Sequence, residues 1–129
     1  MRRHSRYRKL IQDALHVADG PLSATDVHAQ LAETGIGIAT VYRLLNEGVE
    51  DGDLIGVDLP SGPRRFEPAN LPHHHHFECA ACNKVFAVPG CPGNLDRLVP
   101  DGFQLERHEL ILSGRCSDCL PPAQHAGSP

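Results

Sequence analysis

Residues 73–82 read HHHHFECAAC, four consecutive histidines followed two residues later by a C-x-x-C pair. Imidazoles and thiolates are the side chains that bind Zn²⁺ in most protein sites, so this stretch predicts a metal site. In a strand, His73 and His75 would point to one face and His74 and His76 to the other. The run could then supply ligands to two separate sites. A solvated histidine run is the alternative interpretation.

A second C-x-x-C pair, in the stretch GRCSDC, lies further along the chain. Two such pairs can supply four thiolates to one tetrahedral Zn²⁺ ion. A redox-active C-x-x-C is the alternative, but it needs no second pair and usually begins a helix after a strand. We therefore predict a structural zinc site, whose ligands are Cys79, Cys82, Cys116 and Cys119.

The composition limits the size of the hydrophobic core and the kind of partner. The chain has 129 residues, of which 40% are apolar and 5% aromatic, and it has no Trp. Small domains of this kind often need a metal or a partner chain for stability. The net charge of -4 argues against a uniformly basic nucleic-acid binder. Five basic residues near the N-terminus, however, predict a short arm for phosphates, with a solvated terminus as the alternative: Arg2, Arg3, Arg6, Arg8 and Lys9.

The chain has no apolar run that could span a bilayer and no signal-peptide core at its polar N-terminus. We therefore expect a cytoplasmic protein. In that compartment cysteines are more often metal ligands than disulfide partners.

The N-terminal half has the periodicity of helices. Apolar spacing predicts helices over 5–18, 24–33 and 39–52, with Ser23 as the N-cap of the second and Asp26 completing an acidic capping box. The stretch DLIGVDLPSGPRRFEP then predicts two short strands around a turn. Three helices and a hairpin are the order of a winged helix-turn-helix, although any small helical domain shares the periodicity.

In a winged helix-turn-helix the third helix enters the major groove and the hairpin, or wing, contacts the DNA backbone. The candidate DNA-binding residues are Thr40, Tyr42 and Arg43 on the third helix, Arg64 and Arg65 on the wing, and Arg6 and Lys9 at the N-terminus.

The stretch PANLP, with two prolines and no periodicity, predicts a hinge. Beyond it, strands are predicted over 76–81, 84–88, 103–107 and 108–114, and a short helix over 91–99. The expected class is α+β: a winged-helix domain followed by a small α/β dimerisation domain with a four-cysteine zinc site. The expected divisions are 1–67 for DNA binding, 68–72 for the hinge, 73–120 for metal binding and dimerisation, and 121–129 for a disordered tail.

Four stretches in order carry a family resemblance: GIGIATVYRLLN, RRFEP, HHHHFECAACNKVF and HELILSGRCSDC. In combination they resemble the ferric uptake regulator family of metal-responsive repressors, from about Leu10 to Cys119. The resemblance implies a homodimer of two-domain chains in which a regulatory metal sets the angle between the domains. It also implies that Tyr42 contacts bases and Arg43 the backbone.

The resemblance further implies three metal sites. The four cysteines match its structural zinc site. The hinge site would use Glu67, His74 and His76, and the second site would use His73, His75 and His108.

Two departures from the family pattern affect these ligand sets. Many relatives have a histidine where this chain has Pro21, so the hinge site lacks a ligand, and Asp58 is the candidate substitute. The carboxylate position of the second site falls on Cys91 when counted from His108, and on Asn94 when counted from the first C-x-x-C. A Cys91 thiolate would favour Zn²⁺ over Mn²⁺, whereas the alternative is a small buried hydrophobe.

We therefore predict a metal-dependent repressor of metal-uptake genes that binds double-stranded operator DNA as a homodimer. Its cofactors would be structural Zn²⁺ and a regulatory divalent metal, with Zn²⁺ preferred over Fe²⁺ or Mn²⁺. An iron- or manganese-responsive repressor is the alternative within the family, and a zinc-ribbon interaction module without regulatory metal is the alternative outside it. A zinc hydrolase or deaminase is disfavoured because the H-x-E and P-C-x-x-C order is absent.

Overall fold

The computed structural model describes residues 2–121, and the side chains from residue 6 onward. The chain divides into two compact units between Leu71 and Pro72, a boundary that falls within the predicted hinge 68–72. Beyond Pro121 the predicted disordered tail lies outside the described residues. The units are described separately below. None of the helices in residues 2–121 has the length and apolar character needed to cross a membrane.

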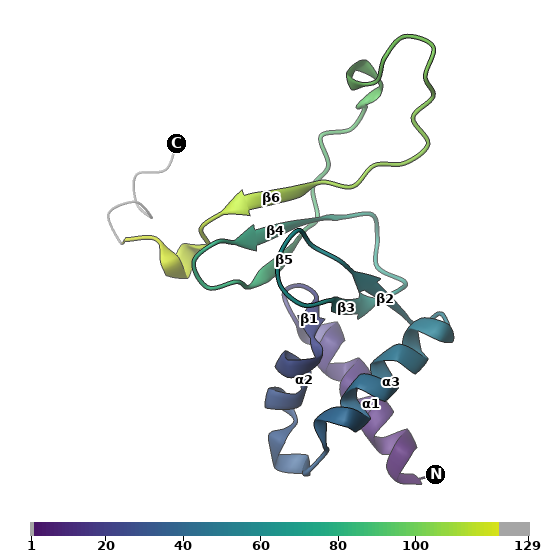
Figure 1. Cartoon of the computed structure of the whole chain (residues 1–129), viewed down its shortest axis with the longest axis vertical. Coiled ribbons are helices and arrows are strands. Elements are labelled where there is room, and N and C mark those ends of the chain that lie inside the picture. The colour runs from purple at the N-terminus through teal and green to yellow at the C-terminus, as the bar shows by residue number, and fades with distance from the viewer. Residues whose placement is uncertain (1, 122–129) are drawn as a thin grey trace. The chain divides into compact units, whose positions relative to one another are not determined.

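The first unit packs three helices against a small antiparallel sheet with the strand order β1-β3-β2 (Figure 1). Its elements are α1 (Arg2–Val17), β1 (Leu22–Ser23), α2 (Ala24–Gln30), a 3-10 turn (Ala32–Thr34), α3 (Ile38–Glu50), β2 (Leu54–Val57) and β3 (Arg65–Pro68). The three predicted helices are present, but α2 ends early in the 3-10 turn. β1 was not predicted, because a two-residue strand has no periodicity. The predicted N-terminal arm is helical, since α1 begins at Arg2.

The capping box at the start of α2 is confirmed. The Asp26 amide donates to the Ser23 hydroxyl over 3.1 Å, and the Ser23 amide donates to the Asp26 carboxylate over 3.1 Å. These bonds satisfy amides at the helix start that have no partner within the helix. After the 3-10 turn, Gly35 ends the segment with φ 79°, a conformation that glycine adopts most easily.

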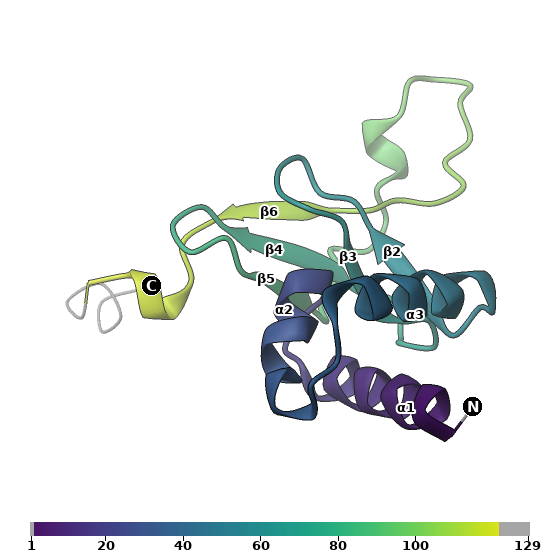
Figure 2. The same ribbon diagram turned by 60° about the horizontal axis from the view of Figure 1, so that its bottom comes forward.

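Helices α1, α2 and α3 lie beside one another in the first unit (Figure 2). Apolar side chains from these helices, the loop before α3 and two strands meet in one hydrophobic cluster. Val27, Val41 and Leu45 are completely buried. The cluster consists of Ile11, Leu15, Ala24, Val27, Ile36, Val41, Leu44, Leu45, Leu54 and Phe66. Burial of apolar surface therefore stabilises the first unit, and it orients α3 so that Tyr42 and Arg43 face solvent.

The second unit is a three-stranded sheet with the order β5-β4-β6 (Figure 1). Its strands are β4 (His75–Cys79), β5 (Val85–Val88) and β6 (Ile111–Gly114). β4 pairs with β5 antiparallel and with β6 parallel. Between β5 and β6 the chain makes a long excursion away from the sheet, which is visible in Figures 1 and 2.

Two predictions for this excursion are wrong. The predicted helix over 91–99 is only a 3-10 turn (Asp96–Leu98), because Pro92 and Gly93 at its start and Pro100 after it oppose a longer helix. The predicted strand over 103–107 is not formed. Among the described residues of the second unit, Cys79 and Val85 are the only buried apolar side chains.

Candidate metal centres and nucleic-acid surface

The four C-x-x-C cysteines lie together at one end of the second sheet, where β4 and β6 finish. Parallel pairing places Cys79, the last residue of β4, opposite Gly114, the last residue of β6. Each strand then leads into a tight turn that carries the remaining thiols. Asn83 has φ 66° in the first turn, and its amide donates to the Cys79 carbonyl over 2.9 Å. The second turn is a 3-10 turn (Ser117–Cys119).

The geometry of the four sulfurs fits a tetrahedral ion. Their ligand atoms lie within 4.8 Å of one another, and the Sγ atoms of Cys82 and Cys116 are 3.8 Å apart. A tetrahedron with Zn–S bonds of about 2.3 Å has an edge of about 3.8 Å. All the cysteines of the chain are free rather than disulfide-bonded. The donor set and its spacing fit Zn²⁺.

The local hydrogen bonds prepare this cluster for a cation. Backbone amides of Cys116 and Cys82 donate to Cys79 Sγ, each over 3.4 Å, and these bonds lower the pKa of Cys79 to about 6. Hydrogen bonding with Cys116 and then Cys79, together with burial, raises the pKa of Cys119 to about 12. One thiol is thus ionised easily and another resists ionisation. A bound dication would remove this conflict by stabilising all four thiolates.

The histidine run alternates as predicted. The rings of His73 and His75 contact each other with centroids 4.6 Å apart, and the rings of His74 and His76 do so at 4.9 Å. β4 begins at His75, and the contacts between residues two apart extend the alternation of its two faces back to His73 and His74. The run therefore separates into two pairs, each with its own surroundings.

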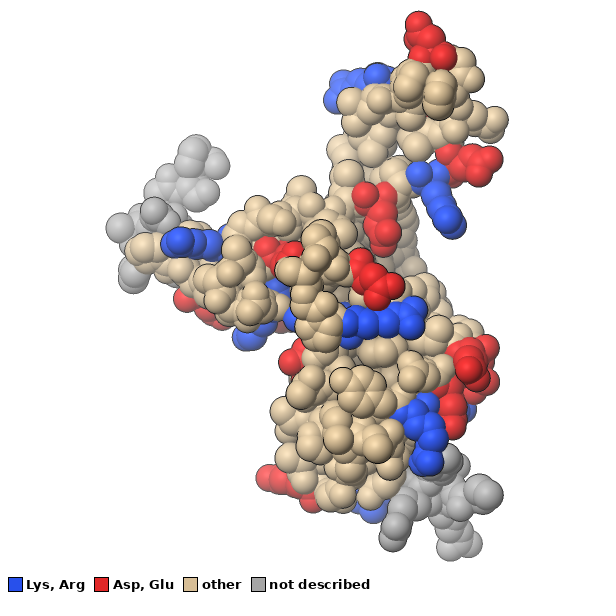
Figure 3. Space-filling view, viewed as in Figure 1, with Lys and Arg blue, Asp and Glu red and all other residues tan. Residues whose placement is uncertain are grey.

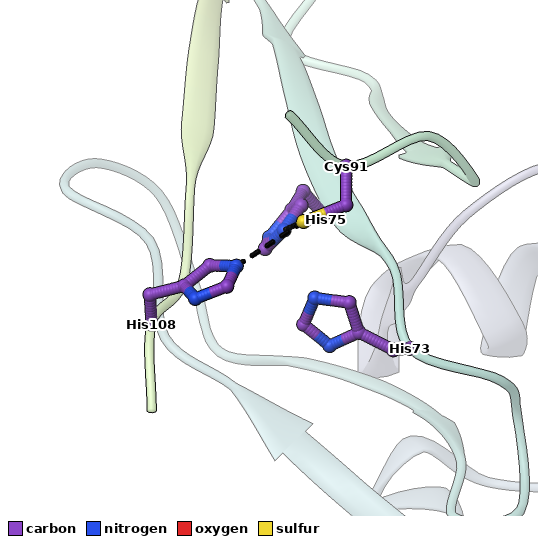
Figure 4. Close-up of side chains that lie close together, drawn as sticks. All are labelled: His73, His75, Cys91 and His108. Atoms are coloured by element: carbon purple, nitrogen blue, oxygen red, sulfur yellow. Dashed lines mark hydrogen bonds between the residues drawn. The ribbon is translucent and has the colours of Figure 1, made fainter. Parts of the chain in front are cut away.

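The pair His73 and His75 lies in a second cluster, which also contains Cys91 and His108 (Figure 4). Cys91 Sγ lies 3.3 Å from Nε2 of His75 and 3.2 Å from Nε2 of His108. The His108 ring is also 5.2 Å from that of His73, centroid to centroid. The ligand atoms of all four residues lie within 4.8 Å of one another, so the structure brings together the whole predicted second site.

His75 is the most strongly fixed member of this cluster. Its side chain is 2% exposed, and the Leu110 amide donates to its Nδ1 over 3.0 Å, so that Nε2 faces Cys91. Burial and then the neighbouring histidines lower its pKa. The ring is therefore neutral at pH 7, as a metal ligand must be. Nε2 is the His75 nitrogen that faces Cys91, so it is the nitrogen that could bind an ion shared with that thiol.

The structure also distinguishes the two alignments for the remaining ligand. Cys91 contacts two histidines of the cluster, whereas the side chain of Asn94 accepts a hydrogen bond from the Asp96 amide over 2.9 Å. Asn94 therefore organises the 3-10 turn. Three imidazoles and a thiol contain no oxygen donor, and this set suits Zn²⁺ better than Mn²⁺.

The predicted hinge site involves both units. Glu67 lies on β3 of the first unit, whereas His74 and His76 belong to the second. This site remains a prediction. Asp58, its tentative fourth ligand, forms an ion pair with Arg64 over 3.4 Å and belongs to no candidate ligand group among residues 2–121. The structure gives no support to a metal role for Asp58.

The predicted DNA-binding residues of α3 lie on its solvent side. Tyr42 is 48% exposed, Arg43 is exposed, and Thr40 is half-buried. The neighbouring residues Val41 and Leu44 enter the core. The exposed face of α3 could therefore meet a nucleic-acid groove without disturbing the core.

Arg65 is predicted to contact DNA phosphates, but its side chain is not placed on the surface. Its side chain is 10% exposed, and its guanidinium forms an ion pair with Asp26 over 3.2 Å. The pairing of β1 with β3 places Ser23 opposite Arg65, which brings the capping box of α2 within reach of the guanidinium. Arg65 thus joins the sheet to α2. Arg64, by contrast, remains half-exposed on the hairpin.

The basic residues of α1 also have different surroundings. Arg8 forms ion pairs with Glu47 over 3.0 Å and with Asp51 over 3.1 Å, so it connects α1 to α3 and its end. Lys9 pairs with Asp13 of the same helix over 3.6 Å. Arg6 is exposed. On the face seen in Figure 3, basic and acidic side chains are interspersed, so DNA binding would depend on individually placed residues.

Sequence reasoning did not identify three contacts that shape these sites: the Leu110 amide on His75, the Asp26–Arg65 ion pair, and the contacts of Arg64 on the hairpin. A backbone amide leaves no trace in residue types. The two ion-paired arginines are adjacent in the sequence, and no local pattern distinguishes the buried one from the exposed one.

Comparison with known proteins finds metal-uptake regulators both among similar sequences and among similar structures. The chain is 38% identical over 103 residues to the ferric uptake regulation protein of Bordetella parapertussis, covering 76% of this chain and 74% of that protein. The iron-bound ferric uptake regulator of Francisella tularensis is 28% identical with a TM-score of 0.68, over 87% of this chain and 89% of that one. FurB of M. tuberculosis, a zinc uptake regulator, is 28% identical with a TM-score of 0.51, over 92% and 95%.

The sequence profile of the Ferric uptake regulator family matches residues 2–113, which include the helices of the first unit and all but the last residue of the sheet of the second. Proteins of this family are transcriptional regulators that bind metal and DNA, so the hydrolase and deaminase alternatives no longer apply. The chain belongs to the ferric uptake regulator family.

Proposed function

We propose that this protein is a cytoplasmic, zinc-responsive repressor of metal-uptake genes that binds operator DNA as a homodimer. One Zn²⁺ would be structural, held by the four C-x-x-C cysteines. Regulatory Zn²⁺ would be held by His73, His75, Cys91 and His108, and a further metal by the hinge residues Glu67, His74 and His76.

The observation that carries the zinc assignment is the position of Cys91. Its sulfur lies within 3.3 Å of two imidazole nitrogens, in a cluster whose ligand atoms are close enough to share one ion. A thiolate among imidazoles favours Zn²⁺, whereas Mn²⁺ prefers oxygen donors. Membership of the family leaves the sensed metal open, because its solved relatives include iron-bound and zinc-responsive proteins.

Homodimerisation is supported by the exposed apolar side chains of the second unit. Leu98 is 71% exposed, Phe103 is 69% exposed and Leu112 is 50% exposed, although this unit buries very little apolar surface of its own. Exposed apolar side chains of this size are typical of a surface that a partner protein covers. A second copy of the chain is the partner that the family resemblance implies.

DNA binding would use the first unit as a winged helix. The core holds α3 with Tyr42 and Arg43 outward, and the hairpin of β2 and β3 carries the half-exposed Arg64. Recognition would follow the usual division, with α3 in the major groove and the hairpin against the phosphate backbone. Arg65 is not part of this proposal because its guanidinium pairs with Asp26.

The hinge residues suggest how metal would control affinity. Glu67 belongs to the first unit, and His74 and His76 to the second, so one ion shared by them would restrict the angle between the units. If that ion binds more tightly when the angle suits DNA, it shifts the population toward the DNA-binding state. In this proposal the metal contributes its charge and its coordination preference. The chain contributes the two angles between its units, one of which the metal favours.

The test is a DNA-binding titration at buffered free-metal concentration. The full chain, with its cysteine-held zinc retained, is titrated against a duplex selected from a random pool, and fluorescence anisotropy reports binding. We expect Zn²⁺ to restore binding at a lower free concentration than Fe²⁺ or Mn²⁺. Activation by Fe²⁺ or Mn²⁺ at physiological levels, without activation by Zn²⁺, would support the iron- or manganese-responsive alternative. Tight binding by protein without regulatory metal would contradict the proposal.

A pair of variants separates the effect of Cys91 from that of its loop. Cys91→Asp introduces an oxygen donor into the cluster and should reduce the preference for Zn²⁺ over Mn²⁺ by at least about tenfold. Asn94→Asp introduces the same side chain three residues away and retains an acceptor for the Asp96 amide, so its metal preference should be unchanged. Equal behaviour of the two variants would remove Cys91 from the site.

A further inference from the structure

Arg64 has a defined position on the hairpin between β2 and β3. It immediately precedes β3, and its side chain lies over Gly56 of β2. A Cβ atom built on Gly56 would overlap the Nε, Cζ and Nη2 atoms of this guanidinium. In the pairing of the two strands, Gly56 lies opposite Phe66. Because Gly56 has no side chain, the space above it is free, and the Arg64 guanidinium occupies that space.

Two further groups border this position. The Asp58 carboxylate lies 3.4 Å from Nε of Arg64, and the Phe66 ring centroid lies 5.9 Å from its Cζ. An arginine over an aromatic ring and beside a carboxylate loses mobility, and the planar guanidinium suits both contacts. The Arg64 side chain nevertheless remains 49% exposed. Part of its hydrogen-bonding fork is therefore open to another acceptor.

We propose that Gly56 is a positioning residue for DNA binding, which seats the Arg64 guanidinium on the wing so that it meets a backbone phosphate of the duplex. The inference rests on the proposed function, in which Arg64 is a DNA contact. An exposed arginine on a flexible chain loses side-chain entropy when it binds. A guanidinium already held by Gly56, Phe66 and Asp58 loses less, and its contact with phosphate is correspondingly stronger.

Gly56→Ala tests the seat without disturbing the fold. The atoms that the new Cβ would meet belong to the end of the flexible Arg64 side chain, which can swing away into solvent. Gly56 does not have a positive φ, and alanine is no worse than glycine within a strand. We therefore expect the thermal stability of Gly56→Ala to equal or slightly exceed that of the natural protein.

The experiment is a double-mutant cycle with the full zinc-loaded chain and the duplex selected from a random pool. Gly56→Ala, Arg64→Ala and the double variant are compared at several salt concentrations. We expect each single variant to bind on the order of fivefold more weakly. The slope of log K against log[salt] should become shallower by ~0.9 for each phosphate that a variant leaves unneutralised. The double variant should bind no more weakly than Arg64→Ala alone.

The outcomes separate the inference from the function on which it rests. If Arg64→Ala binds DNA as tightly as the natural protein, Arg64 is not a DNA contact and that part of the proposed function fails. If Arg64→Ala weakens binding but Gly56→Ala does not, the DNA contact stands and the positioning role is overturned. An additive double variant would also overturn it, because Gly56 would then act without Arg64. A loss of thermal stability in Gly56→Ala would show a structural role instead.

Discussion

The first unit buries ten apolar side chains in one cluster, whereas the described residues of the second unit bury only Cys79 and Val85. The second unit instead concentrates thiols and imidazoles in two groups with the spacing of metal ligands. Three of its large apolar residues, Leu98, Phe103 and Leu112, remain at least half-exposed. The comparison teaches that one chain can draw on two sources of stability: apolar burial holds the helices of the first unit, whereas metal ligands and a partner would hold the sheet of the second in the function proposed above.

The largest effect is expected from loss of the structural zinc. Strong chelation, or Cys116→Ser, should abolish the amide hydrogen-exchange protection of β4 and β6 while α1 and α3 keep theirs. The reason is that structural zinc contributes about 10–16 kcal/mol of apparent binding free energy in small zinc domains. Cys91→Ser, which changes a cysteine outside the four-thiol cluster, is the control and should retain protection. Unchanged protection of β4 after zinc removal would break the comparison.

The next effect should come from the apolar core of the first unit. Leu45→Ala truncates a completely buried side chain, and such changes lower the free energy of unfolding by about 2–5 kcal/mol. Denaturant unfolding followed by the helical circular dichroism signal measures it. Leu98→Ala is the same chemical change at a 71% exposed position of the second unit, and should leave that signal unaltered. Equal losses in the two variants would contradict separate stabilisation.

A smaller effect is expected at the apolar surface of the second unit. Phe103→Ala should weaken dimerisation by roughly ten- to a hundredfold, because covering such a side chain contributes about 1.5–3 kcal/mol. Sedimentation at several protein concentrations measures the dissociation constant. Val17→Ala, at an 81% exposed position of the first unit, provides the control and should not change it. If Phe103→Ala dimerises normally, a partner does not cover this residue.

The smallest effect should come from the ion pairs of α1. Arg8→Ala removes contacts with Glu47 and Asp51, both of which are partly exposed, and such pairs contribute about 0–1 kcal/mol each. Thermal unfolding should therefore change only slightly, and less at high salt. Lys9→Ala removes a single pair within α1 and should have a still smaller effect. A loss comparable to that of Leu45→Ala would mean that charge, and not only apolar burial, stabilises the first unit.

Much of this architecture could be predicted from sequence because its signals are local. Apolar spacing located the three helices, and Ser23 with Asp26 marked the start of the second. The alternation of His73 to His76 followed from the two-residue repeat of a strand. The 91–99 segment was predicted less well, because proline and glycine compete there with a helical pattern.

The amino-acid sequence by itself determined the order of the three helices and the following hairpin, the two C-x-x-C pairs and membership of the family, because repeat periods and ligand spacings are properties of neighbouring residues. Only the tertiary structure decided that Cys91 rather than Asn94 joins His75 and His108, and that Arg65 is paired while its neighbour Arg64 stays half-exposed. These outcomes depend on which distant strands and loops meet. Such tertiary contacts are set by the packing of the whole unit, which no local sequence pattern encodes.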